Sequence, residues 1–240
     1  MLLYGHRCMA GFRKVEKRRH LRYDKNKNKQ KERDVCMANV IKHIIFDMGN
    51  VLLRFDRELF LDRVGAAGED RRALMQEVFC SDDWVGMDRG DHDEPQAAEK
   101  MCARLPEHLH GKAKALVCDW DDPLVPVAGM EELVAELKEA GFGIWLLSNA
   151  SRRQHEYWPR LPVHRYFDGT LISADEGVIK PGEEIYRRCL EKFGLQAAEC
   201  FFIDDTEANI RAAEDLGIRG HVFRFDIEAL RRDLRAAGVI

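Results

Sequence analysis

The stretch IIFDMGNVLL, residues 44–53, decides the fold, because an apolar run ends in one carboxylate and a glycine-containing turn follows at once. The run predicts a buried strand with Asp47 at its carboxyl end. In an open parallel sheet, reactive side chains gather at this edge, where a residue is both firmly based and exposed to a ligand. Asp47 is therefore a candidate nucleophile, although a single aspartate at a strand end more often only caps or turns the chain.

Three later segments of the chain change that balance, because each leads from apolar residues to side chains that bind ions. These side chains are Ser148 and Asn149 after the run 143–147, Lys180 after residues 172–179, and Asp204 and Asp205 after the run 199–203. Carboxylates are hard ligands that bind Mg²⁺ beside a substrate phosphate, and a lysine neutralises a phosphate oxygen. The set predicts an anionic substrate held next to a divalent cation.

Four short motifs give the chain a resemblance to the haloacid dehalogenase superfamily. They stand in the family's order as FDMGNV, LLSN, the lysine of IKPGEEIY and FIDDTEANI, and they frame roughly residues 41–225. One such motif is weak evidence, whereas four in order at suitable spacing are strong evidence. The resemblance implies a hydrolase with a Rossmann-like core.

The resemblance also implies a role for each matching residue. The implied roles are a nucleophile that becomes an aspartyl-phosphate (Asp47), donors to phosphate oxygens (Ser148, Asn149), a charge clamp (Lys180), magnesium ligands (Asp47, the Gly49 carbonyl, Asp205) and supporting residues (Asp204, Asn209). Asp204 either supports the metal or orients Lys180. A covalent carboxylate intermediate is chemically sensible, since it divides phosphoryl transfer into two easier steps.

Gly49 departs from the family pattern, because most phosphatases of the superfamily carry a second aspartate there as general acid and base. Its loss costs about 10²–10⁴ in rate unless another group replaces it. Substrates with acidic leaving groups need protonation least, and the D-x-G-N-V form resembles a branch that includes α-glucose-1-phosphate phosphatases. The resemblance thus favours a sugar-1-phosphate or a similar ester, and Asp88 or another carboxylate of the helical segment is the first candidate for a replacement acid.

Two alternatives from other functional classes stay open at this point. A 2-haloacid dehalogenase also lacks the second aspartate, but such enzymes need no metal, whereas this chain keeps the acidic pair Asp204 and Asp205. A non-catalytic binding protein is the other alternative, because the first 36 residues hold twelve Lys or Arg and four Asp or Glu. Clustered basic charge binds nucleic acid non-specifically. We expect instead a disordered extension that precedes a natural start at Met37.

Residues 56–126 have a different pattern, with apolar residues at helical spacing and no strand signal. We expect a helical cap here, inserted between the first two motifs, that excludes water and selects the leaving group. Within it, a turn-rich stretch carries Trp84, Asp88 and Arg89, which are candidate substrate contacts. The alternative for Trp84 is that it only packs the cap helices together.

The remaining sequence alternates strands and helices, which predicts a doubly wound parallel sheet with helices on both faces. Residues 37–55 and 127–240 are expected to form this core, with strands near Trp145, Ile172, Phe202 and Val222. No apolar stretch approaches the 18 or so residues that span a bilayer. The seven scattered cysteines are expected to be reduced in a cytoplasmic chain. We expect a small phosphate ester and Mg²⁺ as ligands, neither nucleic acid nor membrane as partner, and a monomer or homodimer.

Overall fold

The structure, a computed structural model, describes residues 40–240. The expectations for the basic first 36 residues and for a start at Met37 lie outside this range. Within it, no helix is long and apolar enough to cross a membrane.

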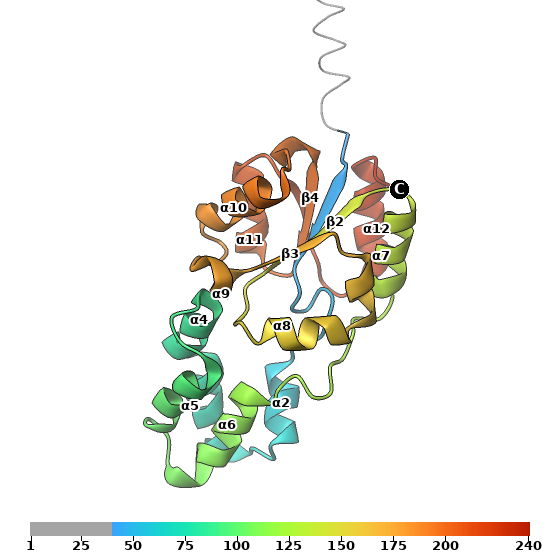
Figure 1. The fold of residues 1–240 in the computed structure, drawn as a ribbon. Coiled ribbons are helices and arrows are strands. Elements are labelled where there is room, and N and C mark those ends of the chain that lie inside the picture. The colour runs from blue at the N-terminus through green and yellow to red at the C-terminus, as the bar shows by residue number, and fades with distance from the viewer. Residues whose placement is uncertain (1–39) are drawn as a thin grey trace, which may run out of the picture. The chain divides into compact units, whose positions relative to one another are not determined.

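Five parallel strands form one sheet in the order β3-β2-β1-β4-β5 (Figure 1). The strands are β1 His43–Phe46, β2 Gly143–Ser148, β3 Gly169–Ile172, β4 Cys200–Asp204 and β5 Arg219–Val222. Phe46 is in register with Leu146 on one side and with Ile203 on the other. The carboxyl ends of β1, β2 and β4 therefore meet at one edge of the sheet.

The strand near Ile172 ends at this residue, whereas the sequence pattern predicts a strand-like segment that continues over residues 172–179 before Lys180. Residues Ser173–Glu176 instead form the short helix α9, which stops at Gly177 with a φ of 70°. This helix has a single turn, which contains Asp175 and Glu176, and acidic side chains in the first turn of a helix are stabilising. The correction matters because α9 places a helical turn, and not a strand, beside the site.

Alternate residues of the strands face two different helical layers, as the two-residue period of a strand requires. One layer consists of α7 Met130–Glu139 and α12 Ile227–Ala236, which cover Ile44, Leu146 and Ile203. The other consists of α10 Glu183–Phe193 and α11 Glu207–Asp215, which cover Ile45 and Phe202. The predicted α/β class with a doubly wound parallel sheet is confirmed.

Shorter elements complete the core. They are α8 Gln154–Tyr157, η3 Trp158–Arg160 and η4 Pro162–Tyr166 between β2 and β3, and η5 Ala197–Glu199 before β4. Trp158 of η3 donates its indole N–H to the hydroxyl of Thr170 in β3 at 3.0 Å, so this connection is fixed to the edge strand.

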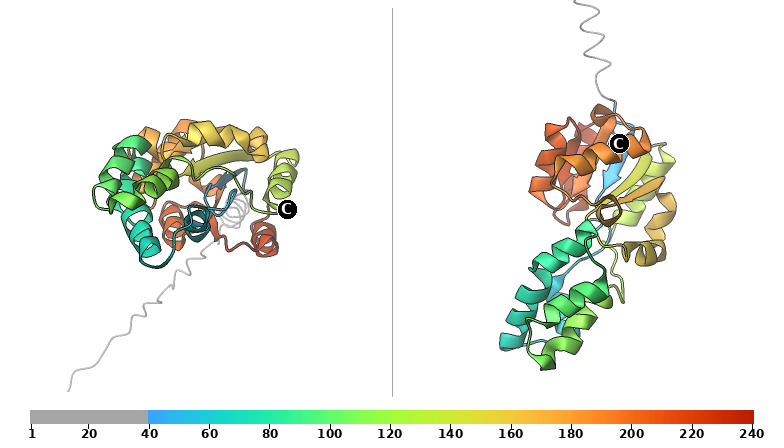
Figure 2. Two further views of the ribbon diagram at one scale, coloured as in Figure 1. Left: turned by 90° about the horizontal axis from the view of Figure 1, so that it is seen from below. Right: turned by 60° about the vertical axis from the view of Figure 1, so that its left-hand side comes forward.

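Residues 57–118 form a group of helices between β1 and β2, here called the helical insert (Figures 1 and 2). Its elements are α2 Arg57–Arg63, α3 Gly68–Leu74, η1 Met75–Phe79, α4 Asp82–Arg89, α5 Glu94–Cys102, η2 Glu107–Leu109 and α6 His110–Cys118. The insert has its own apolar cluster, in which Phe60, Val78 and Met101 are buried. Side chains cap its helices at Asp56, Ser81 and Asp93, which explains where these helices begin.

The two chain segments that join the insert to the core run side by side. Arg54 donates its backbone N–H to Val125 at 2.8 Å, and Val127 donates to Leu52 at 3.0 Å. These bonds lie next to the expected boundaries at residues 55 and 126. The helix α4 of the insert also packs against α9 of the core (Figure 1).

Candidate active site

Asp47 follows the last residue of β1 and is 8% exposed. Its backbone N–H donates to Ile203 at 2.9 Å, which continues the pairing of β1 with β4 by one residue. The next turn is tight, because Leu52 donates to the carbonyl of Met48 at 2.9 Å. The carboxylate thus stands on a rigid strand end, as the sequence pattern indicated.

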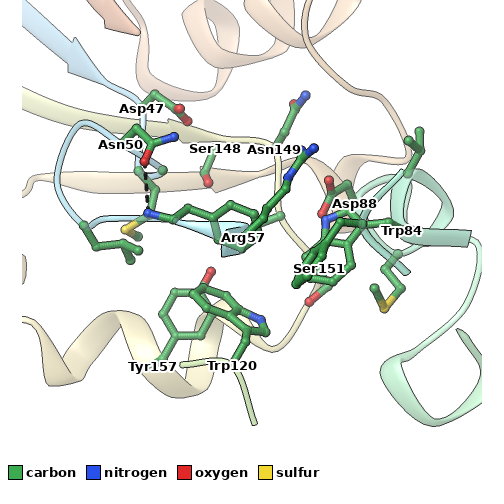
Figure 3. A pocket seen from close by; sticks show the side chains of 18 of the residues that line it. Asp47, Asn50, Arg57, Trp84, Asp88, Trp120, Ser148, Asn149, Ser151 and Tyr157 are labelled. Carbon is green, nitrogen blue, oxygen red and sulfur yellow. Dashed lines mark hydrogen bonds between the residues drawn. The ribbon is translucent and has the colours of Figure 1, made fainter. Parts of the chain in front are cut away.

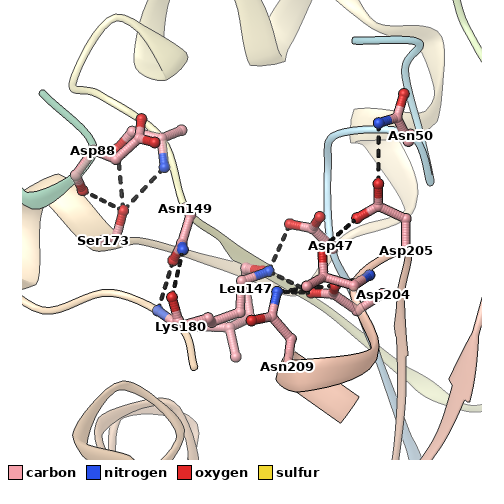
Figure 4. A network of polar contacts seen from close by, with 12 residues as sticks. Asp47, Asn50, Asp88, Leu147, Asn149, Ser173, Lys180, Asp204, Asp205 and Asn209 are labelled. Carbon is pink, nitrogen blue, oxygen red and sulfur yellow. Dashed lines mark hydrogen bonds and ion pairs between the residues drawn. The ribbon is translucent and has the colours of Figure 1, made fainter. Parts of the chain in front are cut away.

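Asn50 holds the turn after Asp47 in place, a role that the sequence did not reveal. Its φ is 56°, a left-handed conformation that asparagine tolerates better than most residues. Its side-chain amide donates to Asp205 at 3.0 Å, and its side-chain oxygen accepts the N–H of Phe55 at 3.0 Å. Asn50 therefore ties Asp205 to the chain that enters the helical insert (Figure 4).

Lys180 lies under Asp47 and is 3% exposed. Its ammonium donates to Asp47 at 2.7 Å, to Asp204 at 2.7 Å and to the backbone carbonyl of Leu147 at 2.9 Å (Figure 4). All three ammonium protons are thereby engaged with the protein. In this arrangement Lys180 balances the charge of Asp47, and it is not among the residues that line the pocket.

Asp204 is fully buried and serves as the anchor of Lys180. Its oxygens also accept the side-chain amide of Asn209 at 3.0 and 3.1 Å and the backbone N–H of Thr206 at 2.8 Å. Of the two roles expected for Asp204, this geometry favours the orientation of Lys180. Asn209 acts on Asp204, in keeping with a supporting role.

Ser148 and Asn149 continue the same edge at the end of β2, and both line the pocket. The side chain of Asn149 makes a reciprocal pair with the backbone of Lys180, donating to its carbonyl at 2.9 Å and accepting its N–H at 2.8 Å. This pair fixes the start of the Lys180 segment against β2. The side-chain amide of Asn149 is thereby engaged with the protein, whereas the Ser148 hydroxyl makes no side-chain hydrogen bond to any of the described residues.

Three carboxylates can present oxygen atoms within 4.8 Å of one another, namely those of Asp47, Asp204 and Asp205. Asp204 is committed to Lys180 and Asn209, so Asp47 and Asp205 are the better placed oxygen donors. The Lys180 ammonium pairs with Asp47 and Asp204 but not with Asp205. A hard divalent cation fits such an oxygen-rich cluster, in which carboxyl groups outnumber the lysine. The expected ligand set of Asp47, the Gly49 carbonyl and Asp205 is compatible with this donor arrangement.

Burial and the neighbouring charges have opposing effects on the pKa values of Asp47 and Lys180. Burial is the largest influence on Asp47, and with Asp204 and Asp205 it raises the pKa of this carboxyl to about 7 against the lowering effect of Lys180. Burial alone would lower the pKa of Lys180, but Asp204 and Asp47 outweigh it and raise that pKa. The lysine is therefore charged, and the cluster carries excess negative charge.

A pocket of about 290 Å³ opens above Asp47 between the core and the helical insert (Figure 3). Its core side holds the polar residues Asp47, Ser148, Asn149 and Asp205. Five aromatic side chains also line it, namely Phe55, Phe79, Trp84, Trp120 and Tyr157. The pocket thus joins a polar, ion-binding end to an aromatic wall.

The aromatic wall is one packed cluster centred on Phe55. The ring of Phe55 lies 5.0 Å from Trp120 and 5.7 Å from Trp84, measured between centroids, and Trp120 lies 5.1 Å from Tyr157. Phe55 and Trp120 come from the two connecting segments and Tyr157 from α8, so no sequence periodicity links them. Trp84 fulfils both interpretations, because it packs within the insert and also faces the pocket.

Asp88 and Arg89 are neighbours in α4 but have different surroundings. Asp88 lines the pocket with Asp47 (Figure 3). Arg89 is exposed, pairs with Asp91, and is not among the pocket-lining residues. The structure therefore brings Asp88 and Trp84 to the site but not Arg89, because successive helical residues point about 100° apart. Arg57 at the start of α2 is a pocket residue that the sequence did not suggest.

Comparison with known proteins agrees with this geometry. A haloacid dehalogenase-like hydrolase family model matches residues 41–217. The sesquiterpene phosphatase astK of Aspergillus oryzae is 28% identical over 196 residues, which cover 77% of this chain and 90% of that protein. Flavin mononucleotide hydrolase 1 of Arabidopsis thaliana is 29% identical over 46% of this chain and 45% of its own length.

Solved structures show the same fold at lower identity. A HAD family enzyme of Bacteroides thetaiotaomicron superimposes with a TM-score of 0.63 and 24% identity, over 80% of this chain and 99% of that one. An L-2-haloacid dehalogenase of Xanthobacter autotrophicus gives a TM-score of 0.58 and 18% identity, over 84% and 85% of the two chains. With four motifs assembled at one sheet edge and the family match over most of the described residues, the chain belongs to the haloacid dehalogenase-like hydrolases.

Proposed function

We propose that this hydrolase is a magnesium-dependent phosphatase that cleaves a small phosphate monoester through an aspartyl-phosphate on Asp47. The observation that carries the proposal is the position of Asp47, which lies at the floor of the pocket, is paired with a buried lysine and stands beside Asp205. A carboxylate so placed is a nucleophile held at a fixed point. The relatives named as phosphatases support phosphate esters as the substrate class.

Asp47, the Gly49 carbonyl and Asp205 are the groups that would hold magnesium in this site. When bound, the ion would neutralise charge on the phosphate and help to orient it for in-line attack. The oxygen-only donor set and its excess negative charge support this assignment. Asn50 contributes by holding the Asp205 carboxylate at 3.0 Å from its amide.

The chain's own residues divide the remaining work. Ser148 and the backbone N–H of Asn149 lie where they can donate to phosphate oxygens. Lys180 orients Asp47 and favours its ionised form against the effect of burial, since its ammonium donates to one carboxylate oxygen at 2.7 Å. Asp204 and Asn209 keep Lys180 in place.

The helical insert acts as a cap in this proposal, with the core at residues 37–55 and 127–240 and the cap at residues 56–126. It covers the pocket from the side opposite Asp47, so it limits water at the reacting phosphorus and contacts the leaving group. Its separate apolar cluster and its paired connecting segments support a unit of this kind.

The aromatic wall indicates which kind of leaving group the pocket accommodates. Rings of Phe55, Trp84 and Trp120 suit an apolar or ring-bearing leaving group, because such rings offer large apolar surfaces with few hydrogen-bond partners. The relative with the longest match among those described is named a sesquiterpene phosphatase, which supports the same choice. The preference for a sugar-1-phosphate, drawn from the D-x-G-N-V motif, stays a prediction to be tested beside it.

The dehalogenase alternative is less well supported. The acidic pair after β4 is retained, and Asp205 faces the pocket together with Asp47. Such a carboxylate beside the nucleophile suits a cation and an anionic phosphate. The likeness to a solved dehalogenase, at 18% identity, concerns the fold alone.

A phosphate-release assay tests the proposal. Prenyl monophosphates, flavin mononucleotide, aryl phosphates, glucose-1-phosphate and 2-chloropropionate should be offered with Mg²⁺ and with EDTA. We expect magnesium-dependent release of phosphate from at least one ester, no release of chloride, and loss of activity in Asp47→Asn, whose amide cannot attack phosphorus. Metal-independent chloride release, or more than a few per cent of phosphatase activity in Asp47→Asn, would overturn it.

A further inference from the structure

We propose that Asp88 of α4 is the general acid and general base of this enzyme, supplied from the helical insert in place of the residue that Gly49 replaces. The proposal rests on the proposed phosphatase function and deepens it. Its basis is the position of Asp88, which lines the pocket with Asp47 and Ser148 although it stands 41 positions after Asp47 in the sequence. It lies on the insert side of the pocket, where a leaving group would depart.

The backbone at Asp88 is fixed to the core. The hydroxyl of Ser173, the first residue of α9, donates to the Asp88 carbonyl, and the same oxygen accepts the N–H of Ala150 at 2.9 Å (Figure 4). Ala150 follows Ser148 and Asn149 after β2. One buried hydroxyl thus links the phosphate-binding edge of the core directly to the residue that carries the proposed acid.

A second attachment lies two residues farther on, at Gly90. The guanidinium of Arg152 donates to the carbonyl of Ala174 at 2.8 Å and to that of Gly90 at 3.4 Å. Gly90 has a φ of 81°, and a Cβ on it would stand 2.2 Å from the Ala174 oxygen. Only glycine permits α4 to approach α9 so closely. These contacts fix the end of α4, and with it Asp88, at a constant distance from the core.

Charged groups from four neighbouring segments surround Asp88. Burial is the largest influence on its carboxyl; Asp47 and Glu94 add to it, Arg57 and Lys180 oppose it, and together they raise the pKa of Asp88 to about 7. A carboxyl that titrates near neutral pH can both give and take a proton there. Its environment therefore suits the role that its position suggests.

Two other pocket residues are less suited to this role. Glu94 accepts a hydrogen bond from the hydroxyl of Ser151, which holds its carboxylate at the side of the pocket. Burial, with Asp88 and Asp121, raises the pKa of Tyr157 well above its usual value, so this phenol does not act as a base near neutral pH. Of the two pocket-lining carboxyl groups outside the ion-binding cluster, Asp88 and Glu94, Asp88 is therefore the better candidate.

The proposed hydrolysis has two steps. In the first, an oxygen of Asp47 bonds to phosphorus, the bond from phosphorus to the ester oxygen breaks, and the Asp88 proton passes to that oxygen, so the alcohol leaves. In the second, a water oxygen bonds to phosphorus and its proton passes to the Asp88 carboxylate. The bond from phosphorus to Asp47 breaks, which releases phosphate and restores both carboxyl groups.

The test compares esters whose alcohols differ in pKa, from nitrophenyl phosphate to simple alkyl phosphates, in wild type and in Asp88→Asn. We expect a shallow dependence of kcat/KM on leaving-group pKa in the wild type. Asp88→Asn should lose about 10²–10⁴-fold with alkyl esters but far less with nitrophenyl phosphate, and the alkaline limb of the pH profile near pH 7 should disappear. Asp82→Asn, the same change in the exposed first turn of α4, is the control and should match the wild type.

A second variant separates lost chemistry from lost structure. A Cβ at Gly49 meets its nearest neighbour, the Cβ of Phe55, at an ordinary 3.8 Å, so an aspartate can start there without a clash. Adding Gly49→Asp to Asp88→Asn should restore hydrolysis of alkyl esters. Equal loss across the ester series, or no loss at all, would overturn the role of Asp88 while leaving the phosphatase intact. Absence of phosphatase activity in the wild type would overturn the proposed function itself.

Discussion

Gly90→Ala is the substitution that most directly tests how the insert is placed over the site. At Gly90 the added methyl would stand 2.2 Å from the Ala174 oxygen, whereas real Cβ contacts essentially never fall below 3.0 Å. The obstacle is a backbone carbonyl of α9, so it cannot turn aside as a side chain would. We therefore expect the end of α4 to move outward by about 1 Å and to carry Asp88 with it.

Gly90→Ala should affect two separately measurable quantities, the stability of the fold and the catalytic rate. A left-handed conformation at a residue other than glycine costs about 1–3 kcal/mol of stability. A displacement of about 1 Å at a catalytic group costs about 10²-fold in rate. Gly90→Ala should show both effects, in denaturant unfolding and in kcat/KM for an alkyl phosphate.

Gly194→Ala supplies the matched control. Gly194 ends α10 with a φ of 66°, as Gly90 ends α4, but nothing lies within 4 Å of its added Cβ. It should therefore lose comparable stability and keep its kcat/KM. If Gly90→Ala retained the same activity as Gly194→Ala, the docking of α4 on α9 would not position the catalytic group, and the reasoning would be refuted.

Three further outcomes follow from the same geometry. Lys180→Met should lower the free energy of unfolding by about 3–5 kcal/mol in urea titrations and abolish turnover, because it leaves Asp47 and Asp204 buried without their cation. Unchanged stability would contradict the ion pairs of Lys180 with these two residues. Asp205→Asn should raise the Mg²⁺ concentration for half-maximal activity at least about tenfold with an unchanged thermal midpoint, whereas an unaltered magnesium titration would remove Asp205 from the ligands. The folded chain keeps the Asp88 proton up to about pH 7 and the unfolded chain only up to about pH 4, so the free energy of unfolding falls as the pH rises from about 4 to about 7. Asp88→Asn should therefore be more stable than the wild type at pH 8 but not at pH 4. If urea unfolding gave the wild type and the variant the same pH dependence, this assignment would be refuted.

The strand ends were predictable because parallel strands place their carboxyl ends at one edge of the sheet. Asp47, Ser148 and Asp204 each follow an apolar run, and the observed register brings their strands together. Lys180 was predictable as a member of the site but not as a buried residue. The contacts of Lys180 depend on the burial of Asp204, and the sequence pattern alone does not show how buried Asp204 is.

The insert was less predictable in detail than in outline. Its helical character follows from apolar spacing, but the orientation of a helix as short as α4, with eight residues, depends on its neighbours. Hence Asp88 and Arg89 were equal candidates, although only Asp88 lines the pocket. The aromatic wall joins Phe55, Trp120 and Tyr157, which are distant in sequence, so only the folded chain reveals it.

Asn50 illustrates a role that sequence reasoning missed although a signal was present. Asparagine directly after a glycine is typical of a turn with positive φ. That signal indicates the turn, but not that the same side chain reaches Asp205 and Phe55. Bonds of this kind depend on β1 and β4 being neighbours in the sheet.

The central claim, that phosphate passes through Asp47, is tested most directly by the stereochemistry at phosphorus. A phosphorothioate ester made chiral with a heavy oxygen isotope is hydrolysed in water that carries a second heavy isotope, and the configuration of the product thiophosphate is determined. Two successive in-line displacements, on Asp47 and then on the aspartyl-phosphate, predict retention of configuration. Inversion would mean that water attacks the ester in a single step, and it would contradict the account.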